Sequence, residues 1–130
     1  MSRRPGPPSA ADTALLFSAM ASESRVRILR LLSGDRLCVG ALSRSTGITA
    51  GAVSQHLRIL RSTGLVEPER RGYFIHYRLA PGAARRLRAA LAGVARPDRA
   101  KPVCDKSSKC LPVRKSSGRG LVRRKQGRRS

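Results

Sequence analysis

The stretch VSQHLRILRSTGLV, residues 53–66, joins a helical period to a stop signal. Its apolar residues Val53, Leu57 and Leu60 stand at positions i, i+4 and i+7, which is the spacing of one face of an α-helix. Gly64 follows and is a typical C-terminal stop for a helix. The pattern predicts an amphipathic helix whose opposite face is polar.

Further periodic segments lie ahead of this stretch. A short extended segment is expected over residues 36–39. The helical period predicts a first helix over residues 12–20, with Leu15, Leu16, Ala19 and Met20 as one apolar face. A second helix is expected to begin after Ser22 as its N-cap and to end at Ser33 and Gly34. Two more helices are expected over residues 40–45 and, after Thr49 as its N-cap, over residues 50–63.

The residues that follow the stretch alternate and then return to a helical period. Residues 65–70 and 73–79 predict two strands, joined by a turn at Arg71 and Gly72. Pro81 is expected to open a fifth helix that runs to about Val94, with Leu87, Leu91 and Val94 on one face. Two helices joined by a short turn and followed by a β-hairpin form a winged helix-turn-helix. The predicted fold is therefore mainly α with a β-hairpin wing.

The charge balance is strongly basic. The chain of 130 residues has 28 Lys and Arg against 7 Asp and Glu, a formal net charge of +21. Such a charge favours a polyanionic partner, with nucleic acid ahead of an anionic membrane surface. The few acids and the two histidines form no acid–base motif, so the sequence argues against an enzyme.

Charge and composition also divide the chain. Residues 96–130 hold 13 basic and 2 acidic residues, a net charge of +11, with few large aliphatic residues and no period. Such a composition does not bury enough apolar surface to offset its ordering entropy. We expect a flexible leader over residues 1–10, a folded winged helix-turn-helix domain over residues 11–95, and a disordered basic tail over residues 96–130.

No apolar run approaches the ~18–20 residues that a membrane helix needs. The first residues faintly resemble an export signal, but Asp12 and the prolines after Arg4 interrupt that pattern. The sequence predicts a cytoplasmic protein with no membrane partner. Its three cysteines are then expected to be reduced thiols.

Three segments resemble one known family when they are taken together. Residues 16–29, 53–66 and 70–79 resemble the opening, the recognition helix and the wing of the bacterial ArsR/SmtB repressors. The resemblance covers about residues 12–94. It implies a homodimeric repressor whose first and fifth helices form the interface, and which binds a double-stranded DNA operator until an inducer releases it.

The predicted DNA-contacting residues lie on the outer face of the helix over residues 50–63 and in the wing. Gln55 is the best candidate for reading adenine, and the arginines are candidates for phosphate contacts. The alternative is that these are solvated polar positions on an amphipathic helix. The full set is Thr49, Gly51, Ser54, Gln55, His56, Arg58, Arg61, Arg70, Arg71 and Tyr73.

The two histidines favour structural or DNA-contacting roles over metal binding. His56 stands beside the apolar face of its helix, where a bond to backbone or phosphate is favoured over a metal. His76 is expected at the surface of a strand. Zinc-sensing members of the family bind the metal through the fifth helix, but residues 81–94 contain no His, Asp or Glu. The resemblance therefore does not extend to that zinc site.

The cysteines are the candidate sensor. Family members that bind arsenite often use a Cys-Val-Cys sequence, and here Cys38 and Val39 are followed by Gly40. Some members place thiols after the last helix, as Cys104 and Cys110 stand here. We expect that the protein requires no cofactor and that arsenite or antimonite is the inducer. Cys104 and Cys110 are expected to bind it, with Cys38 as a third ligand. Alternatives are another soft metal, a redox or non-metal signal, or no sensor role, with Cys38 a small buried residue.

The rival class is an architectural protein that binds nucleic acid without regard to sequence. The basic tail alone would favour such binding, and the cysteines would then be irrelevant. The two classes differ in salt dependence, because tail-driven binding falls steeply with ionic strength and ignores sequence.

Overall fold

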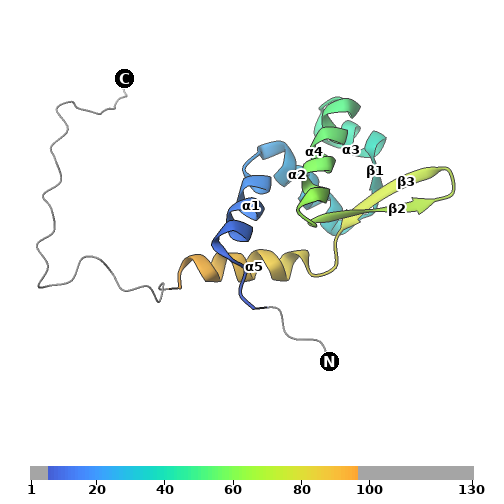
Figure 1. Cartoon of the computed structure of the whole chain (residues 1–130). Coiled ribbons are helices and arrows are strands. Elements are labelled where there is room, and N and C mark those ends of the chain that lie inside the picture. Colours follow the sequence, from blue (N-terminus) through green and yellow to red (C-terminus); the bar gives the residue numbers. More distant parts are fainter. Residues whose placement is uncertain (1–5, 97–130) are drawn as a thin grey trace, which may run out of the picture. The chain divides into compact units, whose positions relative to one another are not determined.

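The structure is a computed structural model, and it describes residues 6–96. These residues form helices and one small antiparallel sheet, with the β2–β3 hairpin extending from the helices (Figure 1). The elements in chain order are α1 (Ala10–Met20), α2 (Glu23–Gly34), β1 (Leu37–Cys38), α3 (Val39–Thr46), α4 (Ala50–Ser62), β2 (Val66–Arg71), β3 (Phe74–Leu79) and α5 (Ala83–Val94). The predicted winged helix-turn-helix fold is confirmed.

The first helix begins earlier than residue 12. Ser9 is its N-cap, and the Ser9 hydroxyl accepts a hydrogen bond of 3.0 Å from the backbone N–H of Asp12. The Asp12 carboxylate accepts in return from the Ser9 backbone N–H. This reciprocal capping box makes Asp12 the third residue of the helix. On the apolar face predicted for this helix, Leu16 and Ala19 are buried, whereas Leu15 is 61% exposed.

The helix-turn-helix is formed by α3 and α4. The predicted N-caps Ser22 and Thr49 are confirmed, and each side chain accepts from a backbone N–H in the first turn of its helix. Gly47 ends α3 with φ of 77°, a left-handed conformation that glycine adopts without strain. The extended segment before α3 is shorter than expected, since Val39 already belongs to the helix.

The sheet has the strand order β1-β3-β2. Arg71 pairs with Phe74, so the turn of the hairpin consists of Gly72 and Tyr73 rather than Arg71 and Gly72. Gly72 has φ of 62°, and a positive φ at the first turn residue suits a two-residue hairpin. The wing therefore turns one residue later than predicted, and Tyr73 lies at its tip.

The fifth helix begins at Ala83, two residues after Pro81. Gly82 precedes it with φ of 80°, which is outside the helical region, so Pro81 lies in a turn and does not open the helix. Ala83 and Ala90 are buried, whereas Leu91 is 65% and Val94 62% exposed. The apolar face predicted for this helix is therefore largely uncovered in one protomer.

The core positions α4 with its polar face outward. Val53, Leu57 and Leu60 are buried, as their spacing predicts. They join a single cluster with residues of α1, α2, α3, α5, β2 and the turn between α4 and β2, namely Leu16, Ala19, Ile28, Leu29, Leu32, Leu42, Leu65, Val66, Ala83 and Ala90. Fully burying a leucine or valine contributes about 1.5–3 kcal/mol, so these three side chains hold the orientation of α4.

No helix within residues 6–96 is long and apolar enough to cross a membrane. Residues 1–5 of the predicted leader and residues 97–130 of the predicted tail, with Cys104 and Cys110, lie outside the described residues.

Candidate nucleic-acid interface

The outer face of α4 presents unengaged polar side chains. Ser54, Gln55 and Arg58 are exposed on the side opposite the buried Val53 and Leu57. Within residues 6–96 the side chains of these three residues have no hydrogen-bond partner. An exposed helix face of this kind fits the major groove, where amide and guanidinium groups reach base edges and phosphates.

The start of α4 is also open. Gly51 is exposed, and a Cβ built on it would meet no atom within 4 Å. The Thr49 hydroxyl accepts a bond of 3.1 Å from the backbone N–H of Ala52. That bond leaves the hydroxyl hydrogen of Thr49 free to donate, so Thr49 serves as the helix cap and remains able to contact DNA. Arg61, about three turns further on, is exposed as well.

The wing tip is basic and aromatic. Arg70 and Arg71 are exposed, and Tyr73 is 97% exposed. The Arg70 Nε donates to the carbonyl of Gly72 at 3.3 Å, which orders the end of the hairpin. Phe74 is 66% exposed and adds a second aromatic side chain at the wing tip. Phe74 was not among the predicted site residues, because strand alternation alone does not show where a hairpin leaves the core.

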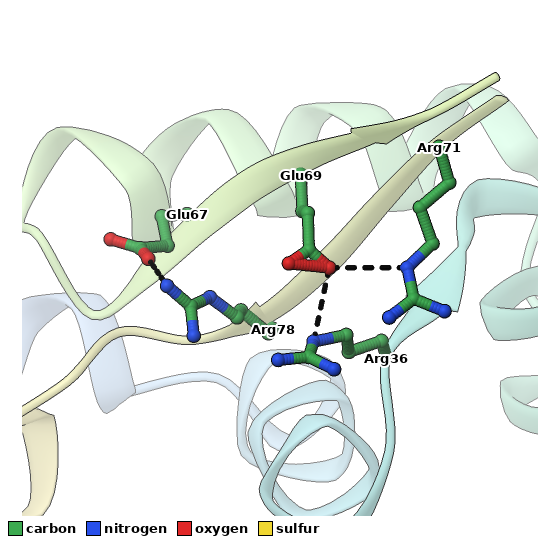
Figure 2. A network of polar contacts seen from close by, with 5 residues as sticks. All are labelled: Arg36, Glu67, Glu69, Arg71 and Arg78. Carbon is green, nitrogen blue, oxygen red and sulfur yellow. Dashed lines mark hydrogen bonds and ion pairs between the residues drawn. The ribbon is translucent and has the colours of Figure 1, made fainter. Parts of the chain in front are cut away.

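Glutamates partly neutralise the arginines of the wing. Glu69 lies between Arg71 of the wing and Arg36, which precedes β1, with its Oε2 3.1 Å from Arg36 Nε and 3.2 Å from Arg71 Nε (Figure 2). Arg78 donates to Glu67 in the same face of the sheet. Exposed ion pairs of this kind contribute only about 0–1 kcal/mol, so a phosphate competes readily with Glu69 for Arg71. Arg36 and Arg78 were not among the predicted site residues.

His56 contacts another helix. It is half-buried, and its Nδ1 lies 3.5 Å from Nη1 of Arg25 in α2. No pattern in the sequence links Arg25 to this site, because the two residues belong to different helices. Across the described part of the chain, no three His, Cys, Asp or Glu side chains are grouped so as to hold a metal.

His76 differs from its expected place at the strand surface. It is half-buried in β3, between Cys38 of β1 and Glu69 of β2 in the register of the sheet. Its Nδ1 is buried and has no hydrogen-bond partner among the described residues. The ring nitrogen is therefore covered, although the side chain lies on the polar face of the sheet.

Cys38 is half-buried at the junction of β1 and α3, and it is a free thiol. It is the one cysteine within residues 6–96, and Cys104 and Cys110 lie outside these residues. A Cβ built on Gly40 would lie 3.9 Å from the Cys38 Sγ. Position 40 is thus close enough for a second thiol, but this chain has glycine there.

The fold and this surface define a winged helix-turn-helix domain of the kind that regulates transcription. Residues 22–68 match the model of the family described as "Bacterial regulatory protein, arsR family". This matched segment contains α2, α3 and α4.

Named relatives agree with the family model. The "Transcriptional repressor SmtB homolog" of Synechocystis sp. is 42% identical over 55% of this chain and 54% of that protein. The "HTH-type transcriptional regulator YgaV" of Escherichia coli is 38% identical over 66% of this chain and 88% of that protein. The "Arsenical resistance operon repressor" of Escherichia coli is 39% identical over 51% of this chain and 57% of that protein.

A solved structure shares the fold. The homodimeric winged helix-turn-helix DNA-binding domain of a possible ArsR-family regulator from Mycobacterium bovis aligns with a TM-score of 0.56 and 32% identity. The alignment covers 72% of this chain and 88% of that one. This chain therefore belongs to the ArsR/SmtB family of transcriptional regulators, and the relatives described above are named as regulators rather than as enzymes.

Proposed function

We propose that this chain is a homodimeric transcriptional repressor that binds a double-stranded DNA operator through α4 and the wing. The observation that carries the proposal is the outer face of α4, where Ser54, Gln55 and Arg58 are exposed and unengaged within the described residues. Gln55 is suited to bond the N6 and N7 groups of adenine, and Arg58 a phosphate. Arg70 and Arg71 extend the same contacts along the wing.

Uncovered apolar side chains on two adjacent helices support the dimer. Leu15 of α1 and Leu91 and Val94 of α5 are more than half exposed, and Phe17 is 36% exposed. A groove of about 790 Å³ lies along the same two helices, and Leu15, Leu16 and Ala89 are among its lining residues. Pairing two copies over this surface would cover it and present two α4 helices, whose half-sites are expected about 34 Å apart.

Thiols are the proposed inducer site. Arsenite is held by two or three thiolates, and Cys104 and Cys110 stand six positions apart in the sequence. A short polar loop joins them at little closure entropy. Cys38 is the proposed third ligand. The relative named for arsenical resistance is the comparison that supports a metalloid inducer. Such a regulator would act in the bacterial cytoplasm, where thiols are reduced.

Fluorescence anisotropy on the DNA upstream of the gene tests the proposal. The reduced full-length protein is titrated onto that duplex and onto an unrelated duplex at moderate salt, with and without arsenite. The expected result is tight binding to the upstream DNA, weak binding to the unrelated duplex, and release by arsenite. Specific binding that arsenite does not change would overturn the proposal that arsenite is the inducer, and the proposal of a repressor would stand. Equal binding to both duplexes would overturn the repressor.

Point variants separate the parts of the proposal. Gln55→Ala is expected to cost about 1–3 kcal/mol of operator affinity, because a bidentate base contact is lost. Arg30→Ala, which removes an exposed arginine of α2, is the matched control and is expected to bind normally. The double variant Cys104→Ser with Cys110→Ser is expected to bind the operator normally and to resist release by arsenite.

The architectural protein is the second candidate, and the net charge of +11 on residues 96–130 favours it. Counterion release would then dominate the affinity. The comparison of the two duplexes decides between the candidates, since an architectural protein binds both alike.

A further inference from the structure

Arg25 joins the end of α1 to the middle of α4. Its Nε donates to the carbonyl of Ala19 at 2.5 Å, and its Nη2 donates to the carbonyl of Ser18 at 3.3 Å. Both carbonyls lie in the last turn of α1, where a positive charge is favourable, and the Ser18 carbonyl also accepts from the backbone N–H of Ala21 at 3.1 Å. These two bonds fix the guanidinium on α1 although Arg25 belongs to α2.

The remaining nitrogen of this guanidinium faces the recognition helix. Nη1 of Arg25 lies 3.5 Å from Nδ1 of His56, the residue after Gln55. A guanidinium has donors only, so a hydrogen bond between these two atoms requires Nδ1 of His56 to accept. An imidazole that accepts at Nδ1 is neutral and carries its proton on Nε2. The contact therefore selects one tautomer of His56.

The Nε2 atom is then free for DNA. It makes no hydrogen bond within residues 6–96, and it is not among the buried unpartnered atoms of those residues. It lies on the other side of the ring from Arg25, and the adjacent Gln55 is exposed on the same helix. A donor at this place suits a phosphate oxygen beside the bases that Gln55 reads.

We propose that Arg25 is a positioning residue for operator binding: it holds the imidazole of His56 with Nδ1 accepting, so that Nε2–H donates to a DNA phosphate. This inference rests on the proposed function, because it assumes that α4 docks on DNA. Arg25 itself does not touch the DNA. Its bonds to Ser18 and Ala19 also mean that the recognition helix is held to α1, one of the two helices proposed for the dimer interface.

A double-mutant cycle in operator affinity tests the proposal. Arg25→Met has a similar length and no donor, and it is expected to weaken operator binding about tenfold, as expected for one charge-assisted bond. His56→Gln places an amide N–H donor near the position of Nε2. Unlike the imidazole, this amide does not need Arg25 to select a tautomer before it can donate. In the His56→Gln background, Arg25→Met is therefore expected to change affinity less than about twofold. A tenfold loss in both backgrounds would overturn the proposal and leave Arg25 as a structural cap of α1.

A second variant guards against loss of folding. Arg25→Lys keeps a cation at the end of α1 but cannot reach both α1 and His56, because an ammonium lacks the forked geometry. It is expected to unfold near the wild-type temperature and still to lose most of the operator affinity that Arg25→Met loses. Wild-type affinity in Arg25→Lys would overturn the proposal.

Nuclear magnetic resonance of the free full-length protein tests the contact without DNA. At about pH 8, where an ordinary imidazole is neutral, long-range proton–nitrogen spectra report the state of each ring nitrogen. The expected result is a protonated Nε2 and a hydrogen-bonded Nδ1 in His56, with the Nδ1 resonance shifted in Arg25→Met and His76 unchanged. An Nδ1 resonance that Arg25→Met does not move would overturn the proposal. A failure of operator binding in the wild type would instead overturn the proposed function, and this spectrum would still report the contact.

Discussion

Arg86 of α5 donates a hydrogen bond of 2.9 Å from its Nη2 to the main-chain carbonyl of Thr63, the residue that caps the C-terminus of α4. Its Nη1 donates to the next carbonyl, that of Gly64, at 3.2 Å. The last carbonyls of a helix favour a cation, so this arginine stabilises the end of α4 from a different helix. α4 is thus held from α2 by Arg25 and from α5 by Arg86.

Replacing Arg86 by alanine is expected to lower the stability of the domain. The two bonds are exposed, so we expect a loss of about 0.5–1 kcal/mol, or about 2–8 °C in the unfolding midpoint. Circular dichroism during heating measures it. Arg88→Ala is the matched control, because Arg88 is an exposed arginine of the same helix without a hydrogen bond in the described part of the chain. Equal midpoints for the two variants would contradict the role of Arg86.

Replacing Gly40 by cysteine is expected to create a pair of thiols with Cys38. The new Cβ would lie 3.9 Å from the Cys38 Sγ and 3.3 Å from Nη1 of Arg44, which is the end of a flexible side chain and can move. Two thiolates hold arsenite far better than one. In a background with Cys104→Ser and Cys110→Ser, calorimetry should detect arsenite binding only after Gly40→Cys is added. Binding by the parent with Cys38 alone would show that the pair is not needed.

Replacing Leu91 by aspartate is expected to dissociate the proposed homodimer. Leu91 is 65% exposed in one protomer, and a carboxylate there would be buried against an apolar partner surface. Sedimentation velocity should then report the mass of one chain in place of two. Ala92→Asp adds the same charge one residue away, off the stripe of Leu87, Leu91 and Val94, and should remain dimeric. A dimer that survives Leu91→Asp would place the interface elsewhere.

Removing residues 96–130 is expected to weaken binding to all DNA without removing operator preference. The segment carries a net charge of +11, and each phosphate contact that it makes contributes about 0.9 to the slope of log affinity against log salt. Anisotropy titrations at several salt concentrations measure the slope. A full-length variant with the tail arginines and lysines changed to glutamine should behave like the truncated chain. Loss of the operator preference itself would favour the architectural protein.

The local sequence pattern was sufficient to predict the helices and strands and the orientation of α4. Val53, Leu57 and Leu60 recur with the helical period, and burying them leaves Ser54, Gln55 and Arg58 outside. The caps Ser22 and Thr49 were also recognisable, because capping depends on residues only three positions apart. Errors occurred where backbone conformation decides the boundary, as at Gly82, whose positive φ delays α5 beyond Pro81.

Contacts between distant segments were not accessible from the pattern. Arg25 and His56 are 31 residues apart, and Arg86 and Thr63 are 23 apart, so no period or spacing pairs them. The same holds for the exposure of Leu15 and Leu91, since a helix pattern shows which residues share a face but not whether that face is covered. Hydrophobic periodicity encodes local conformation and the direction of the core, whereas long side chains find their partners only after the helices have packed. The sequence alone therefore predicts a winged helix-turn-helix with a polar recognition face, and the packed structure adds how that face is held.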